Sequence, residues 1–477
     1  RKPIIVVKAG RTGAGSRAAS SHTAALAARD VAVDALFRQT GVIRADTLEE
    51  MFDLASALGN QPLPPGRRVA ILTNAGGPAI LCADACEAAG LSVVDLSETT
   101  KGQLAAFLPA TASVRNPVDM IASAGAEAYG RAIKALLASD DVDALIVIHV
   151  AAGACDAAAV MLAAQECASS RSMSGAIAKP ILACVMPERA STDCGCAGNN
   201  NIPCYAFPET AARVLGKAAT YAEWKAQPLG RVPELADIDL DAAHAVCKEA
   251  LNKNGNGWLS TEATRRVLQA MGLPISAGGV AKTAQEAAAL ARGLGFPVAV
   301  KLASHEIVHK TEMGGVHLGL SDEIAVIRAF DEIRKRLDKE NQLHAMDGVL
   351  IQPMIHGGTE VFVGMTQDPL FGPLIAFGLG GIHVEILGDV CFRVTPLTDR
   401  DACEMVHAIR GYRLFQGYRG HPAADVAALE QVLLRVSRLV EEIPEITEVD
   451  LNPIFALSPG QGCRIVDARI RVQNQSE

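Results

Sequence analysis

The repeated order of an apolar strand, a glycine-bearing turn and a helix constrains this chain more than any other feature. Arg68–Thr73 is typical of a buried strand, a tight turn follows over 74–78, and 79–89 has a helical pattern that ends at Gly90. The alternation continues to further apolar runs at 144–148 and 180–185. Strands that alternate with helices predict a parallel, doubly wound sheet, so we expect an α/β fold.

The length of 477 residues predicts about three compact units. Three prolines and a glycine over 61–66 have linker chemistry, and the stretch 235–256 ends in polar, glycine-bearing punctuation. Beyond it, helical patterns mix with apolar strands up to a last strand at 463–468. We therefore expect units at 1–60, 61–229 and 237–477.

Composition excludes several classes of protein. With 44 basic and 53 acidic side chains, the net charge of -9 disfavours electrostatic binding to nucleic acid. No apolar run reaches the length that spans a bilayer, and we expect a cytoplasmic protein. The chain starts with Arg1 and passes directly into the strand-like run 3–7, so we expect that an N-terminal part is missing.

The 12 cysteines are scattered, and without a signal peptide we expect reduced thiols and no disulfide. Cys194, Cys196 and Cys204 could be ligands of a soft metal. No CxxC pair or histidine-rich segment accompanies them, so ordinary thiols are the favoured interpretation.

The third unit holds side chains suited to a phosphate-bearing ligand. Lys301 ends an apolar strand, where its ammonium could meet phosphate oxygens or could extend to solvent as a structural lysine. The strand 349–354, which contains Gln352 and Met354, is typical of a nucleotide hinge. Glu360 follows a glycine pair, and the run 378–381 offers the backbone amides of Gly380 and Gly381 to an anion.

Two oxygen-bearing side chains near the C-terminus could bind a divalent cation. Asn452 stands in the run 448–453, and Asp467 follows 15 residues later in another strand. Carboxylate and amide oxygens on neighbouring strands suit Mg²⁺, which water and nucleotide phosphates usually complete. Ordinary capping of strand ends is the alternative interpretation.

These motifs together resemble those of known families. The runs VAVKL, GTEVFVG, GLGGIHVE, EVDLNP and VDAR resemble an ATP-grasp domain. The segments 8–23, 73–78, 116–119 and 309–311 resemble NDP-forming, or ADP-forming, acyl-CoA synthetases, which are relatives of succinyl-CoA synthetase. The resemblance covers essentially the whole chain. It implies the C-terminal part of a first ligase domain, a second, flavodoxin-like ligase domain and an ATP-grasp domain, without the family's N-terminal CoA-binding domain.

The resemblance implies two histidines that carry a phosphoryl group. His22 in the SHT motif matches the residue that is phosphorylated transiently, and a neutral imidazole is a competent nucleophile near neutral pH. Ala24 departs from the family, which commonly has glycine there. His309 resembles a second, shuttle histidine, with a loop histidine bonded to backbone as the alternative.

The resemblance also implies the ligands of the nucleotide and of the phosphohistidine. Lys301 and Glu360 would contact phosphate and ribose or metal, the hinge from Gln352 to Met354 would hold adenine, and Asn452 with Asp467 would bind Mg²⁺. Asp450 would support them. The turn with Asn74, Gly76 and Gly77 would provide one of the helix N-termini that stabilise the phosphohistidine.

The implied reaction is the reversible conversion of a carboxylic acid, CoA and ATP into acyl-CoA, ADP and phosphate, through acyl phosphate and phosphohistidine. Its cofactors are ATP or ADP, Mg²⁺ and coenzyme A. We expect an oligomer, with the CoA-binding region on missing sequence or on a separate subunit. Two other functions stay open: the scaffold of a protein acetyltransferase fusion, and a different ATP-grasp carboxylate ligase. The acid and the choice between ADP and GDP also stay open.

Overall fold

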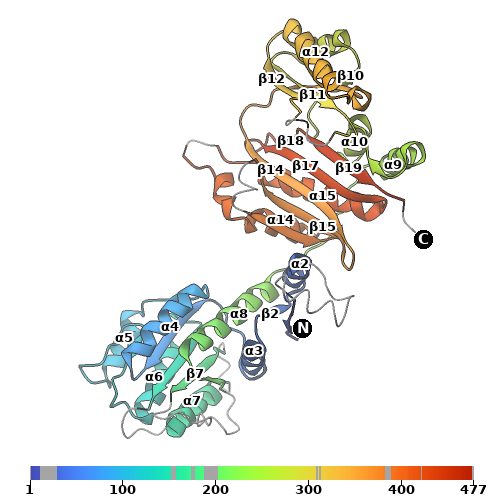
Figure 1. The fold of residues 1–477 in the computed structure, drawn as a ribbon. Helices are drawn as coiled ribbons and strands as arrows, with labels where there is room; N and C mark the ends of the chain where they lie inside the picture. The colour runs from blue at the N-terminus through green and yellow to red at the C-terminus, as the bar shows by residue number, and fades with distance from the viewer. Residues whose placement is uncertain are drawn as a thin grey trace. The chain divides into compact units, whose positions relative to one another are not determined.

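The computed structural model forms two compact units, which we describe one at a time (Figure 1). The first unit contains Arg1–His22 and Thr40–Pro228, and the second contains Thr23–Gln39 and Leu229–Glu477. The structure describes residues 2–10, 30–151, 157–172, 178–186, 202–307, 310, 313–381, 388–419 and 422–474.

The first unit is built on a parallel sheet with the strand order β4-β3-β6-β7-β8, in which β5 also pairs with β3. A separate parallel pair joins β1 to β2. The strands are β1 (Ile5–Val7), β2 (Ile43–Ala45), β3 (Arg68–Thr73), β4 (Ser92–Val93), β5 (Val118–Asp119), β6 (Ala144–Val150), β7 (Ile181–Met186) and β8 (Cys204–Tyr205).

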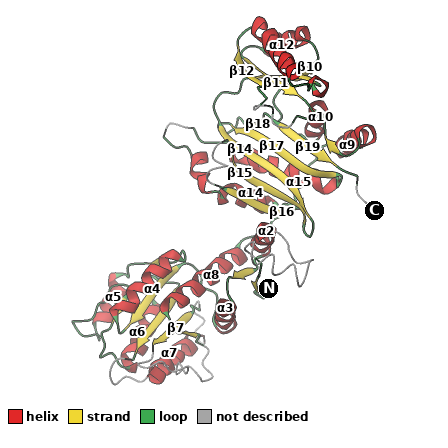
Figure 2. Ribbon diagram, in the orientation of Figure 1, coloured by secondary structure: helices red, strands yellow, loops and turns green. Residues whose placement is uncertain are grey.

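Helices cover both faces of this sheet (Figure 2). On β3, Val69 and Ile71 pack into the core formed with α3, α4 and α8, whereas Ala70 and Leu72 pack into the core formed with α5, α6 and α7. A strand buried on both faces is apolar throughout, as the predicted doubly wound α/β fold requires, and the prediction is confirmed. These helices are α3 (Leu48–Asn60), α4 (Gly76–Ala88), α5 (Glu98–Ala105), α6 (Ala126–Ala138), α7 (Ala157–Ser172) and α8 (Pro208–Ala226).

The second unit contains two antiparallel sheets. One has the order β10-β13-β11-β12, and the other has the order β16-β15-β14-β17-β19-β9, with β18 also paired to β17. The strands are β9 (Gly257–Trp258), β10 (Gly279–Ala281), β11 (Val298–Ala303), β12 (Val316–Leu320), β13 (Gly348–Pro353), β14 (Thr359–Asp368), β15 (Gly372–Leu379), β16 (Val390–Val394), β17 (Ile446–Ala456), β18 (Cys463–Ile465) and β19 (Ala468–Val472).

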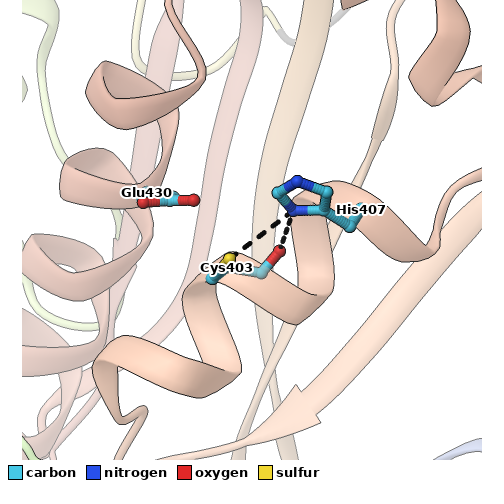
Figure 3. A group of neighbouring side chains, drawn as sticks. All are labelled: Cys403, His407 and Glu430. Carbon is cyan, nitrogen blue, oxygen red and sulfur yellow. Dashed lines mark hydrogen bonds between the residues drawn. The ribbon is translucent and has the colours of Figure 1, made fainter.

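Each of these sheets packs its own helices. Helices α11 and α12 share a core with the four-stranded sheet, and α9, α10, α14 and α15 share a core with the seven-stranded sheet. The helices are α9 (Leu240–Asn254), α10 (Thr261–Ala270), α11 (Ala284–Leu294), α12 (Glu323–Lys339), α14 (Asp399–Ala408) and α15 (Val426–Glu442). Where α14 and α15 lie side by side, Cys403 and His407 face Glu430 (Figure 3).

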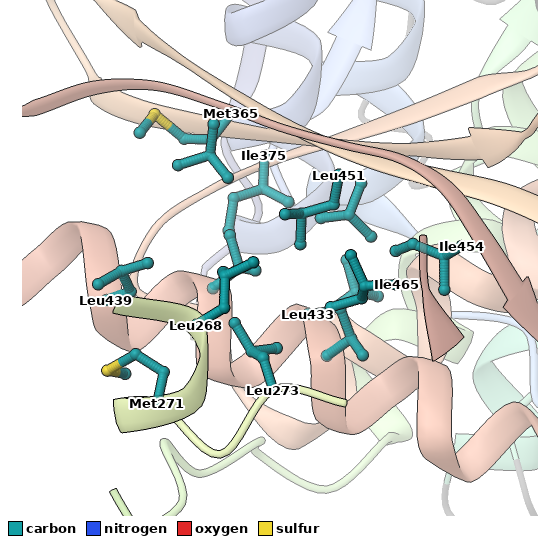
Figure 4. Close-up of a cluster of buried hydrophobic side chains, with 14 of the residues drawn as sticks. Leu268, Met271, Leu273, Met365, Ile375, Leu433, Leu439, Leu451, Ile454 and Ile465 are labelled. Carbon is teal, nitrogen blue, oxygen red and sulfur yellow. The ribbon is translucent and has the colours of Figure 1, made fainter. Parts of the chain in front are cut away.

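The larger core shows why the seven-stranded sheet buries one face. Val361, Val363 and Met365 alternate along β14 with more accessible residues, the pattern of a strand that packs on one side only. Figure 4 shows Met365 and Ile375 from the sheet with Leu433 and Leu439 from α15 in this cluster. Because these side chains face the helices, the opposite face of the sheet stays available for other contacts.

Helix α2 (Asp30–Thr40) packs on the outer strands of the seven-stranded sheet. Ala32 and Ala35 contact Leu374 through a small apolar cluster. Gln39 Nε2 donates to the carbonyl oxygen of Val394 at 2.9 Å, and the Val394 amide donates to Gln39 Oε1 at 2.8 Å. Because β16 is an edge strand, this side chain pairs backbone groups that the sheet leaves open.

Three features differ from the expectations. The stretch 235–256, for which no helix was predicted, is largely helix α9, and Asp239 caps this helix by accepting from the Ala242 amide. The strand expected at 463–468 is two strands, β18 and β19, and Asp467 lies between them.

The expectation of reduced thiols throughout is wrong at Cys204, which is disulfide-bonded. A disulfide requires the two Cα atoms to lie close in the folded chain, and spacing alone does not reveal that. Cys194 and Cys196 lie outside the described residues. In the described part of the chain, the helices fall short of the length and apolarity that a bilayer crossing demands.

The Gln39 contact gives a testable prediction. Gln39→Ala removes both hydrogen bonds to Val394, which should lower the free energy of local opening of α2 by about 1–2 kcal/mol. Amide hydrogen exchange across α2 and β16 measures this. Gln227→Ala, at an exposed glutamine of the first unit, is the matched control. Equal protection of α2 in the two variants would contradict the role of Gln39.

Candidate functional site

A cavity of about 440 Å³ lies in the second unit, between the four-stranded sheet and strands β17 to β19. It brings together five of the predicted site residues, namely Lys301, Gln352, Met354, Asn452 and Asp467. Its other lining residues are Ala299, Lys310, Val316, Leu318, Pro353, Ile355, Asp450, Pro453, Phe455, Val466 and Arg469. The cavity therefore combines apolar side chains with charged and amide groups, as small-molecule sites do.

Two lysines supply positive charge to the cavity from positions that are nearly closed to water. Lys301 is 8% exposed and donates from Nζ to the carbonyl oxygen of Val466 at 3.3 Å, and Lys310 Nζ lies 3.4 Å from Asp467 Oδ1. Burial lowers the pKa of Lys301, against the opposing effect of the Asp467 carboxylate, and the charge of Lys310 lowers it further. An anion between the two ammonium groups would remove much of this electrostatic cost.

Three oxygen-bearing side chains line the same cavity, and one of them, Asp467, pairs with Lys310. Asp450 and Asn452 belong to β17, and Asp467 stands where β18 gives way to β19; the backbone amide of Asn452 donates to the Asp467 carbonyl oxygen at 3.1 Å. Burial raises the pKa of Asp450; Arg469, its partner in strand register, acts against this, and Asp467 and Glu448 add to it. Carboxylates that repel each other and one amide oxygen form a donor set that fits Mg²⁺.

The hinge strand forms the floor of the apolar part. Gln352 is 2% exposed, and its Oε1 has no hydrogen-bond partner within the described structure. A buried acceptor left unpaired costs free energy, so this atom indicates a donor on a ligand. Beyond it, the Met354 amide donates to the Pro297 carbonyl oxygen at 3.1 Å, which holds the strand end against the loop before β11.

Glu360, Gly380 and Gly381 form a separate group at the ends of β14 and β15. The Gly380 amide donates to the Glu360 carbonyl oxygen at 2.8 Å. A Cβ atom on Gly380 would lie 2.6 Å from Glu360 Cγ, so only glycine fits there. None of the three lines the cavity described above, and their contact with a ligand stays a prediction.

In the first unit, Asn74, Gly76 and Gly77 lie where β3 passes into α4. The Asn74 side chain is 3% exposed and holds the end of β6, because it accepts from the Val150 amide and donates to the Val150 carbonyl oxygen, both at 2.8 Å. Helix α4 begins at Gly76 without a side-chain cap. Asp119 occupies this end, since a Cβ atom on Gly76 would lie 3.2 Å from its Oδ2. The anion-binding role of this turn stays a prediction.

The two predicted catalytic histidines, His22 and His309, lie outside the described residues. The neighbour of the second, Lys310, is described, and its carbonyl oxygen accepts from the Gly315 amide at 2.7 Å. The amide of Leu302 in turn donates to the Gly315 carbonyl oxygen at 2.7 Å. Gly315 therefore links the backbone of Lys310 to the strand that carries Lys301.

The site contains two cations that sequence reasoning did not select. Lys310 stands directly after His309 in the quoted run, and Arg469 follows Asp467 by two positions. Their signal was therefore present in the motifs. Only the folded arrangement shows that both reach the cavity that Lys301 lines.

The fold and this cavity define a class of protein: an ATP-grasp unit joined to CoA-ligase domains. Three family models match the chain in order. They are a succinyl-CoA ligase like flavodoxin domain at residues 1–58, a ligase-CoA domain at residues 69–227 and an ATP-grasp domain at residues 250–472.

The chain is 36% identical over 471 residues to 4-hydroxybutyrate–CoA ligase [ADP-forming] of Nitrosopumilus maritimus, an alignment that covers 98% of this chain and 66% of that one. It is 42% identical to acetate–CoA ligase [ADP-forming] II subunit beta of Pyrococcus furiosus, over 47% of this chain and 95% of the subunit. The chain belongs to the ADP-forming acyl-CoA ligase family. It spans about two-thirds of the length of the first of these relatives.

Among solved structures, the chain resembles a dinucleotide-forming acetyl-coenzyme A synthetase 1 of Ca. Korarchaeum cryptofilum. The sequence identity is 37% and the TM-score is 0.46, over 48% of this chain and 100% of that one.

The burial of Lys301 predicts a stability effect in the ligand-free protein. Because the lysine pKa is lowered in the fold, the charged ammonium destabilises the native state at neutral pH, and this cost disappears once the pH is high enough to deprotonate it. Lys301→Met should therefore raise the unfolding free energy at pH 7 by about 1–2 kcal/mol, and the gain should shrink as the pH rises.

Denaturant unfolding at several pH values measures the effect. Lys282→Met, at an exposed lysine, is the control. A Lys301→Met protein that is less stable than the native chain at pH 7 would show that the ammonium contacts outweigh its desolvation.

Proposed function

We propose that this chain carries the phosphoryl-transfer machinery of an ADP-forming acid–thiol ligase that acts in the cytoplasm. The reaction converts a carboxylic acid, CoA and ATP reversibly into acyl-CoA, ADP and phosphate. The observation that supports this most is one cavity that joins two buried lysines to oxygen ligands and to a hinge with an unpaired acceptor. Family membership supports it independently. The proposed functional domains are 1–60, 61–229 and 237–477.

The cavity is proposed to hold the nucleotide. The apolar wall around Met354 and Phe455 offers surfaces for a base, and Gln352 Oε1 can accept a hydrogen bond from an amino group on it. Lys301 and Lys310 would then face the phosphates. Phosphoryl transfer needs mainly positioning and charge neutralisation, which these groups supply without a reacting side chain in the cavity.

Asp450, Asn452 and Asp467 would hold the magnesium ion. When bound, the ion neutralises phosphate charge and orients the phosphate oxygens. The contribution of this chain is to keep Asp450 and Asp467 close despite their mutual repulsion, with Arg469 and Lys310 as the neighbouring cations. A bound divalent cation would favour the ionised form of Asp450.

His22 is proposed as the acceptor of the γ-phosphoryl group. In each transfer an imidazole nitrogen attacks phosphorus and a P–N bond forms. The P–O bond to ADP breaks in the transfer to His309, and the P–N bond of His309 breaks in the transfer to His22. The phosphoryl group then passes to the carboxylate as acyl phosphate, and the CoA thiolate displaces phosphate. His309 is proposed to relay the group between the nucleotide and His22, and the α4 turn with Gly76 and Gly77 to stabilise the phosphohistidine. Glu360, Gly380 and Gly381 are proposed to contact the nucleotide from the second sheet.

CoA binding is proposed to need sequence in addition to this chain, on the same polypeptide or on a partner subunit. The Pyrococcus relative is named as a beta subunit, which supports the second arrangement. Assembly with such a subunit is part of the proposal.

The nucleotide site is tested by binding. Lys310→Met should weaken ATP roughly 10- to 100-fold with or without Mg²⁺, because a charge-assisted bond to phosphate is lost. Asp467→Asn should weaken ATP mainly when Mg²⁺ is present. Isothermal titration calorimetry on the full chain measures both, with Lys282→Met and Asp331→Asn as exposed controls. Unchanged ATP affinity in both site variants would contradict the proposal that this cavity binds the nucleotide.

The phosphohistidine is tested by labelling. Incubation of the chain with γ-labelled ATP and Mg²⁺ should give a protein-bound label that acid removes and base does not, and peptide mapping should show that His22→Asn loses the label at position 22. His309→Asn should slow its appearance, and His344→Asn, at an exposed histidine, should have no effect. Normal labelling of His22→Asn would refute the assignment, whatever the outcome of the binding experiment.

A further inference from the structure

A cluster of three metal-ligating side chains lies away from the nucleotide cavity. Cys403 and His407 stand four residues apart on α14, so they share one helical face, and Glu430 on α15 faces them (Figure 3). One ligand atom from each lies within 4.8 Å of the other two. None of them lines the cavity described above.

The spacing of the two α14 ligands matches a tetrahedral metal centre. Cys403 Sγ lies 3.6 Å from His407 Nδ1. With Zn–S of about 2.3 Å and Zn–N of about 2.0–2.1 Å, tetrahedral angles place sulfur and nitrogen about 3.6 Å apart. The pair therefore already has the separation that a shared ion imposes.

The histidine is held in place by two further contacts. His407 Nδ1 lies 2.8 Å from the Cys403 carbonyl oxygen, and the rings of His407 and Tyr412 are 4.3 Å apart. Coordination through Nδ1 replaces the hydrogen bond to the carbonyl oxygen, while the tilted Tyr412 ring still packs against the imidazole. The site therefore needs little rearrangement to accept an ion.

The charges around Cys403 distinguish a cation site from a reactive thiol. The carboxylates of Glu430, Glu404 and Asp399 stand around this thiol. A nucleophilic or redox-active cysteine needs the opposite, a thiolate stabilised by positive charge. The same carboxylates attract a divalent cation, whose charge can replace the thiol proton.

We propose that Cys403, His407 and Glu430 bind a borderline-soft divalent cation of the Zn²⁺ class, with water at the remaining position. The mixed sulfur, nitrogen and oxygen donors suit Zn²⁺ and disfavour Mg²⁺, which takes oxygen ligands. Binding breaks the S–H bond of Cys403, forms a metal–sulfur bond and releases one proton to solvent.

The proposed ion would join α14 to α15 across the surface of the second unit. Both helices cover the seven-stranded sheet, and the start of α14 also holds the chain near Leu229, where the main part of the second unit begins: the Arg231 amide donates to Asp399 Oδ1 at 2.8 Å. Ion binding should therefore stabilise this unit, by a free energy that grows with the logarithm of one plus the ratio of metal concentration to the dissociation constant.

Cobalt titration of the full chain under reducing conditions tests the site. Bound Co²⁺ should give a thiolate-to-metal charge-transfer band that Zn²⁺ displaces, and Zn²⁺ should raise the melting temperature. Cys403→Ser should lose the band and one metal equivalent. His407→Asn and Glu430→Gln should each weaken metal binding by at least roughly 10- to 100-fold, because loss of a residue that only hydrogen-bonds a metal ligand already has an effect of that size.

Matched controls are Cys167→Ser in the first unit and the exposed His344→Asn, which should both bind as the native chain does. Circular dichroism and ATP affinity establish that each variant is folded. A band and stoichiometry unchanged by Cys403→Ser would overturn the proposal. Loss confined to Cys403→Ser, with native affinity in the other two site variants, would also overturn the three-ligand site.

Discussion

The desolvated ammonium group of Lys301 is the constraint on which the candidate site depends. A strand of one sheet carries this charge to within hydrogen-bond distance of Val466, which follows β18 in the other sheet. Such a charge is costly unless an anion or a polar group meets it. Beside it, the ammonium of Lys310 meets the carboxylate of Asp467 at 3.4 Å. Both lysine contacts are long and therefore weak. These are contacts that a phosphate can replace.

Much of the fold could be predicted because periodicity depends on burial. β3 is apolar at successive positions since helices cover both faces, and β14 alternates since one face is open. Helices α9 and α14 were not predicted. In both helices, polar residues obscure the apolar periodicity of the sequence. Their caps are recognised only from the hydrogen bonds in the structure: Asp239 caps α9, and Thr398 with Asp401 forms the capping box of α14.

The candidate site was predictable to the extent that its chemistry lies in continuous motifs. The expectation that Lys301 ends a strand is wrong, since Lys301 and Asn452 lie within β11 and β17, and Asp467 lies between β18 and β19. The structure nevertheless brings all three to one cavity. The sequence does not reveal that Lys310 lines the cavity, because the path of the folded loop decides which of its side chains reaches the ligand site. Asn74 was predicted to contribute to an anion site, but its side-chain amide is hydrogen-bonded to the backbone of Val150 at the end of β6.

Helix α2 shows how an edge strand can be closed without a further strand. Gln39 offers both a donor and an acceptor to the backbone of Val394, so one side chain does for this residue what a neighbouring strand would do. Open backbone groups on an edge strand are a template for pairing with another molecule. With Ala32 and Ala35 packed against Leu374, α2 therefore protects β16 from aggregation through its edge.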